Sequence, residues 1–136
     1  MVQEVAGELV ARIELAAATT SDALAGLRAG CEGWLQAMAD PQLHRLYLVE
    51  APAALGLSRW REIDAAYGGG LLRRGIAAVL AERADSGPDL ESLTALLSGA
   101  LNEAALWIAD ADDQRAARRA MSRTLDALLG RLFATA

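Results

Sequence analysis

The sequence predicts an all-α fold in which six helices form a single domain over residues 1–136. Apolar residues recur at the spacing of an amphipathic helix, and no stretch shows the alternating pattern of a strand. Capping residues, prolines and glycines divide the chain into segments. The expected helices cover residues 2–18, 22–38, 41–51, 58–84 and 88–109, with a last helix that begins at Asp110 or Asp112 and ends near Phe133.

The first two helices follow from their apolar spacing and, for the second, from a cap. Val5, Leu9 and Ile13 recur every fourth residue on one side of the first helix. The chain begins inside this pattern without a cap, which indicates a helix that continues from a longer parent or a native short chain that starts in mid-pattern. Thr20-Ser21-Asp22 supplies the side-chain oxygens that cap the second helix.

Proline and glycine set the limits of the third and fourth helices. Asp40-Pro41 places an N-cap before a proline at the first helical position, and Pro52 with Gly56 is expected to stop that helix. Ser58 is the expected N-cap of the fourth helix. Gly68-Gly69-Gly70 lies in the middle of it. Because each glycine costs a helix about 0.5–1 kcal/mol relative to alanine, the run indicates a kink or the close approach of another helix.

The last two helices carry apolar residues over most of their circumference. Asp85-Ser86-Gly87-Pro88 forms the turn before them, and Asp110 with Asp113 resembles a capping box between them. A helix that is apolar on several sides must be covered on more than one side. We therefore expect a homodimer in which both helices meet their copies in a four-helix bundle. The expected interface residues are Leu93, Leu97, Ala100, Leu101, Ala104, Met121, Leu125, Leu128, Leu129 and Leu132.

Charge and composition limit the classes of partner. The formal net charge is −5 and all 13 cationic side chains are arginines, which argues against a nucleic-acid-binding surface. Charges interrupt each long apolar run, so no membrane span is expected. The N-terminal residues lack the cations of an export signal. The single cysteine, Cys31, excludes an intrachain disulfide and fits a reducing cytoplasm.

Catalytic, metal and cofactor sites find no support in the sequence. His44 is the one histidine, so no pair of histidines can hold a metal, and it is expected at the surface or the edge of the core. Cys31 lies in an apolar stripe and is expected to be a buried structural thiol. No phosphate-binding loop, nucleophile elbow or metalloprotease motif is present. We therefore expect a protein that is not an enzyme.

Several charged residues admit two interpretations. Glu50 lies in an apolar helix and is expected either to pair with Arg59 or Arg61 or to anchor a ligand at the rim of a cavity. Asn102 and Glu103 interrupt the apolar fifth helix, where they contact a ligand or fix the register of a helix interface. The run Arg115, Arg118, Arg119 and Arg123 is expected to be a solvated face balanced by nearby aspartates.

The aromatic residues suggest a ligand cavity among the second to fifth helices. Tryptophan and tyrosine join a large apolar body to one polar group, and ligand sites combine many apolar residues with a few polar ones. The expected lining is Trp34, Met38, Tyr47, Glu50, Trp60, Ile63, Tyr67, Asn102, Glu103 and Trp107. Such a cavity favours an apolar or aromatic ligand of modest size that is cationic or hydroxylated rather than anionic.

Two stretches resemble the C-terminal regulatory domain of the tetracycline-repressor (TetR) family of bacterial transcription regulators. They are LYLVEAPAALGLSRWREIDAAYGGGLL at residues 46–72 and ALNEAALWIADADD at residues 100–113. The resemblance implies an all-helical domain that binds a small-molecule effector and dimerises through its last two helices. It also implies an N-terminal helix-turn-helix for DNA binding, which these residues do not contain. The alternative is a small helical dimeric interaction or scaffold protein without a ligand cavity.

Overall fold

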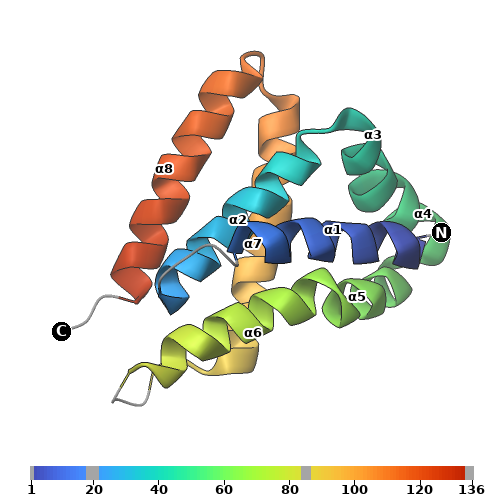
Figure 1. Ribbon diagram of the computed structural model, residues 1–136. Helices are drawn as coiled ribbons and strands as arrows, with labels where there is room; N and C mark the ends of the chain where they lie inside the picture. Colours follow the sequence, from blue (N-terminus) through green and yellow to red (C-terminus); the bar gives the residue numbers. More distant parts are fainter. Residues whose placement is uncertain (1, 18–21, 84–86, 134–136) are drawn as a thin grey trace.

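The computed structural model describes residues 2–17, 22–83 and 87–133, which form helices joined by turns, with no strand among them (Figure 1). This confirms the predicted all-α class. In chain order the elements are α1 (Val2–Ala17), α2 (Ala23–Met38), α3 (Pro41–His44), the π-helix η1 (Arg45–Glu50), α4 (Ala51–Leu55), α5 (Leu57–Ala66), α6 (Gly68–Ala81), α7 (Leu90–Asp110) and α8 (Gln114–Leu132).

The helix α2 lies at the centre and packs against α1, α3, α6, α7 and α8 (Figure 1). Asp22 begins it, because its carboxylate accepts the Ala25 backbone N–H at 2.7 Å. Thr20 and Ser21, also expected to cap α2, lie outside the described residues. The stripe that α2 buries in the core is Leu27, Cys31, Trp34, Leu35, Ala37 and Met38. A helix surrounded in this way fixes the positions of its neighbours.

The expectation that Pro52 ends the third helix was wrong. The chain stays helical from Pro41 to Leu55, because η1 widens the turn and the Ala51 N–H donates to the Leu46 carbonyl. Pro52 then lies in the first turn of α4, where its missing N–H costs little. Gly56, with a φ of +82°, ends the segment.

The single helix expected over residues 58–84 is divided into α5 and α6, so the six-helix count was wrong. Tyr67 leaves helical geometry there, with φ −114° and ψ −90°. Gly70 is required at this break, because a Cβ on it would lie 2.9 Å from the Ala65 carbonyl oxygen. The glycine run thus permits the close approach of two consecutive helices. Ser58 does not cap α5, which begins one residue earlier with Gly56 at the N-cap position.

The last two helices begin slightly later than expected, at Leu90 instead of Pro88 and at Gln114 instead of Asp110 or Asp112. Asp89 caps α7 by accepting the Ser92 N–H at 2.9 Å, and Asp113 caps α8 by accepting the Ala116 N–H at 3.0 Å. α7 is long and apolar enough to cross a membrane by length and composition, although no span was expected. Core helices of soluble proteins share that property, and α7 does contribute Leu97 to the core.

A polar cluster joins α8 to α2. The Arg118 guanidinium lies 3.0 Å from the Glu32 carboxylate and also donates to the Glu32 carbonyl oxygen, while Ser122 donates to that carboxylate at 3.0 Å. Only 21% of the Arg118 side chain and 33% of that of Glu32 is exposed. The arginine run is therefore not a uniformly solvated face, because Arg118 turns inward to an acid on the central helix.

We predict that Arg118→Ala lowers the free energy of unfolding by about 1–3 kcal/mol, because it leaves a partly buried carboxylate short of donors. Urea unfolding followed by circular dichroism measures the loss. The matched control is Arg119→Ala, one residue along the same helix at an exposed position, which should change stability by less than about 0.5 kcal/mol. Equal unfolding midpoints for the two variants would contradict the role given to Arg118.

Candidate functional site: a cavity between α1, α2, α6 and α7

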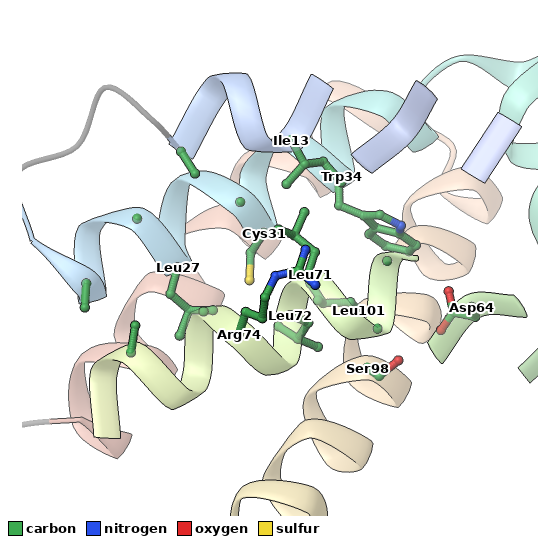
Figure 2. A pocket seen from close by; sticks show the side chains of 18 of the residues that line it. Ile13, Leu27, Cys31, Trp34, Asp64, Leu71, Leu72, Arg74, Ser98 and Leu101 are labelled. Carbon is green, nitrogen blue, oxygen red and sulfur yellow. The ribbon is translucent and has the colours of Figure 1, made fainter. Parts of the chain in front are cut away.

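A cavity of about 350 Å³ lies where α1, α2, α6 and α7 meet, next to the end of α5 (Figure 2). Its walls are mostly apolar side chains and glycines. The residues from α1 and α2 are Ile13, Ala17, Ala23, Gly26, Leu27, Gly30, Cys31 and Trp34, with Asp22 at the α2 cap. The remaining residues are Asp64, Gly68, Gly69, Leu71, Leu72, Arg74, Gly75, Ala78, Ser98, Leu101 and Asn102. The cavity therefore lies between α2 and the helices around it, and the N-terminal helix α1 is one of them.

Glycines make the cavity possible, because the facing helices carry no side chain at several lining positions. A Cβ on Gly30 would meet Ile13 Cγ2 at 3.5 Å, and a Cβ on Gly75 would lie 3.2 Å from Leu27 Cδ1. These distances place α1 close to α2 and α2 close to α6. The helices are thus in contact around the cavity.

One end of the cavity is polar, and Asp64 is its centre. The Tyr47 hydroxyl donates to Asp64 Oδ1 at 2.5 Å, and the Ser98 side chain forms a second hydrogen bond with the same carboxyl group. Asn102, one turn further along α7 than Ser98, completes this polar end. Figure 2 labels Asp64, Ser98 and Trp34 among the side chains that line the cavity.

Buried aromatic rings hold the Tyr47 hydroxyl in place. The Trp60 indole N–H donates to the Tyr47 carbonyl oxygen at 2.8 Å. The two rings pack edge to face, with centroids 5.7 Å apart. Both side chains lie in the core, so the hydroxyl that faces Asp64 has a fixed position.

Burial controls the ionisation of three groups at the site. Desolvation raises the pKa of Asp64, and the hydrogen bonds from Tyr47 and Ser98 offset that rise in part. Desolvation and the neighbouring Asp64 charge also raise the pKa of Tyr47, which stays a hydrogen-bond donor. Burial raises the pKa of the Cys31 thiol to about 12, so Cys31 is an unreactive buried thiol as expected.

The structure separates the residues expected to line one cavity. Trp34 and Asn102 line the cavity described here, and Tyr47 contacts its polar end through Asp64. Trp60 and Ile63 lie in the adjoining core, and Tyr67 is the half-buried residue between α5 and α6. Met38 lines a different depression, beside His44 and the start of α8. The cavity was expected to lie among the second to fifth helices. This expectation is corrected, because α1 forms one of its walls and the expected third helix, residues 41–51, forms none.

Three of the expected lining residues are exposed instead. Glu50 forms an ion pair at 2.7 Å with Arg45, so neither Arg59 nor Arg61 is its partner and it does not lie at the rim of this cavity. Glu103 is exposed on α7, and 51% of Trp107 is accessible to solvent. A polar or aromatic residue on an apolar helix faces outward as readily as inward, and the sequence did not reveal which face α7 turns to the core.

Asp64 was missed, although its spacing contains a signal. Trp60, Ile63, Asp64 and Tyr67 stand at positions i, i+3, i+4 and i+7 of the helical pattern, which places them on one face. The first two are buried, so the acid on the same face is drawn toward the core with them. A carboxylate at an apolar position of an amphipathic helix was therefore the sequence feature that indicated a polar site.

The residues expected at a dimer interface also divide into two groups. The protomer's own core contains Leu93, Leu97, Leu101, Ala104, Leu125 and Leu129, so these side chains are not on a face that a second copy would meet. Met121 and Leu132 are half-buried against that core, while Ala100 and Leu128 are exposed. The large exposed apolar residues of α7 are Leu96 and Trp107, of which Trp107 was expected to line the cavity.

The fold and the cavity define an all-α domain with an apolar pocket beside its N-terminal helix. The family model described as "Tetracyclin repressor-like, C-terminal domain" matches residues 24–132. The chain therefore belongs to the tetracycline-repressor family and contains its C-terminal domain, which confirms the resemblance. Domains of this kind are typically regulatory. No curated protein matches the chain in sequence.

We predict that Asp64→Asn stabilises the chain at neutral pH. Because the pKa of Asp64 is raised, there is a pH range above 3.8 in which the folded chain still holds the Asp64 proton and the unfolded chain has released it. The free energy of unfolding therefore falls as the pH rises from the ordinary pKa of 3.8 through the raised folded value. Asparagine keeps an acceptor for Tyr47 without the charge, so the variant should be more stable above that window and should lack this pH dependence.

Urea unfolding at a series of acid to neutral pH values measures the effect. The control is Asp22→Asn, which removes a charge from an exposed residue of the same cavity and keeps a good helix cap. If the free energy of unfolding had the same pH dependence in the wild-type chain and in Asp64→Asn, the burial of this carboxyl group would be contradicted.

Proposed function

We propose that this chain is the effector-sensing and dimerisation domain of a TetR-family transcription regulator of the bacterial cytoplasm. In this proposal the cavity binds a small apolar or aromatic effector. Its occupation controls DNA binding by a helix-turn-helix joined to the N-terminal side of α1. The chain itself contributes neither DNA contacts nor catalysis. Family membership and the cavity beside α1 support this function.

The single observation that carries the proposal is the position of α1 in the cavity wall. Ile13 and Ala17 of α1 line the cavity together with residues of α2 and α6, so an occupant touches α1 directly. Arg74, which also lines the cavity, pairs with Glu14 of α1 at 3.5 Å. A ligand that displaces α6 or Arg74 therefore acts on the helix that would lead to the DNA-binding module.

The cavity also supports this function over its alternative. A small helical interaction protein would have a filled core, since interiors are close-packed and cavities are destabilising. Ligand sites typically have volumes of about 300–1,000 Å³, and the cavity of about 350 Å³ falls in that range. Its lining of apolar residues with a few polar groups at one end is the usual composition of such sites.

We predict that Gly30→Leu abolishes the binding of small aromatic compounds, because its side chain would fill the cavity from α2. The test is a thermal-shift assay with indole, phenethyl alcohol and phenethylamine. A compound at 100 times its dissociation constant should add about 2.7 kcal/mol to the stability of the wild-type chain and nothing to that of the variant.

Gly7→Leu is the matched control, because a Cβ on Gly7 of α1 meets nothing within 4 Å and Gly7 does not line the cavity. This variant should keep the wild-type thermal shift. If no compound stabilises the wild-type chain, or if both variants respond alike, the cavity is not the effector site.

An exposed apolar face on α7 supports the dimerisation part of the proposal. Leu96, Ala100 and Trp107 stand on one side of α7, and 72% of Leu96 is exposed. Leu128 of α8, the neighbouring helix, is 43% exposed. Large apolar side chains grouped at a surface mark interaction sites. We infer that this face, and not the residues in the protomer's core, meets the second copy.

We predict that Leu96→Asp converts a dimer into a monomer, because it places a charge in the centre of the proposed contact. Sedimentation at micromolar concentration should give about twice 14.3 kDa for the wild-type chain and about 14.3 kDa for the variant. Leu15→Asp is the matched control, since Leu15 of α1 is 76% exposed and lies outside the proposed face. A monomeric wild-type chain would refute the dimer.

A further inference from the structure

Asp64 has no cationic partner in the described part of the chain. Its two recorded interactions are the hydrogen bonds with the Tyr47 hydroxyl and the Ser98 side chain. An ionised carboxylate offers about four acceptor positions, so two donors leave other positions open to a ligand. A charge at the edge of an apolar cavity is costly unless a counter-charge or further donors reach it.

The glycine run leaves the carboxylate accessible from the cavity. Gly68 and Gly69 both line the cavity. A Cβ on Gly68 would lie 3.5 Å from Asp64 Oδ1, and a Cβ on Gly69 would lie 3.6 Å from Oδ2. A methyl group at either position would lie in van der Waals contact with one of the two carboxylate oxygens and would occupy the space beside it. The absence of side chains beside the acid gives a ligand group room to approach it.

The surroundings of Asp64 suit a positive group more than a neutral one. Trp34 lines the same cavity, and an indole ring attracts a cation through its π-electrons. Ser98 and Asn102 supply oxygens that accept hydrogen bonds from an ammonium group. The formal net charge of −5 also favours the approach of cations.

Arg74 is the cation that lines the cavity, and its position does not satisfy Asp64. Its guanidinium pairs with Glu14, and both side chains are more than half exposed to solvent. Its charge is therefore balanced by an acid on α1 and by the solvent to which its side chain is exposed. Asp22, the other acid of the lining, is also exposed and serves as the cap of α2.

We propose that the cavity selects organic cations, in which an ammonium group binds the Asp64 carboxylate and an attached apolar or aromatic body fills the space between α2 and α6. This inference rests on the proposed effector function and names the chemical class of its ligand. The ammonium group donates to Asp64, with Ser98 and Asn102 as further acceptors. The apolar body contacts Leu27, Leu71 and Leu72.

The test compares three probes of similar size and shape: phenethylamine, phenethyl alcohol and phenylacetate. Isothermal titration at neutral pH measures their dissociation constants for the wild-type chain. Because an ammonium group adds its positive charge to the hydrogen bond that an alcohol also donates to the carboxylate, the amine should bind about tenfold more tightly than the alcohol, and phenylacetate should bind most weakly. This comparison needs no variant.

Substitution then assigns the selectivity to one residue. Asp64→Asn should weaken phenethylamine about tenfold or more and change the affinity for the alcohol by less than about twofold. Glu103→Gln removes an exposed acid of α7 that does not line the cavity and should leave both affinities unchanged. A wild-type chain that binds the alcohol as tightly as the amine keeps the effector function and overturns the selection of cations. A chain that binds none of the three probes overturns both.

Discussion

The burial of α2 among α1, α3, α6, α7 and α8 is the constraint on which the other features depend. A helix surrounded on most sides needs a partner for each polar group that it carries. Glu32 of α2 therefore pairs with Arg118 of α8, and the Arg28 guanidinium donates to the Asp126 carbonyl oxygen at 3.3 Å. These contacts fix α8 against α2, while Gly30 of α2 and Gly75 of α6 let α1 and α6 approach α2 closely.

The cavity arises from that same close packing. Helices held together at glycines cannot fill all the space between them, and the space that remains lies beside the acid of α5. A filled core with an apolar residue in place of Asp64 would be more stable by the ordinary rules of packing and desolvation. Features that lower stability in this way are characteristic of functional sites. The raised pKa of Asp64 reflects the free-energy cost of burying its charge.

The two faces of α7 connect the core to the proposed assembly. One face contributes Leu93, Leu97 and Leu101 to the core and Ser98 to the polar end of the cavity. The other exposes Leu96 and Trp107. A rigid helix that touches the cavity on one side and a second copy on the other would transmit a change at either surface, provided that it has two packed arrangements.

The sequence by itself determined the all-α class, the caps at Asp22 and Asp40, the burial of Cys31 and the similarity to the regulatory domain of the family. These properties depend on local spacing and on side chains that bond to nearby backbone, which a linear pattern records directly. The sequence did not determine whether a helix ends at a proline, because η1 widens one turn and the chain stays helical past Pro52.

The tertiary structure alone decided which apolar and charged residues face inward. Leu97 and Leu96 are neighbours of the same residue type, yet one lies in the core and the other on the surface. Glu50 pairs with Arg45 inside η1, whereas Asp64 accepts from Tyr47 because α5 packs against η1. When a helix is apolar on several sides, its periodicity does not define a unique buried face, and the packing of its neighbours makes that choice.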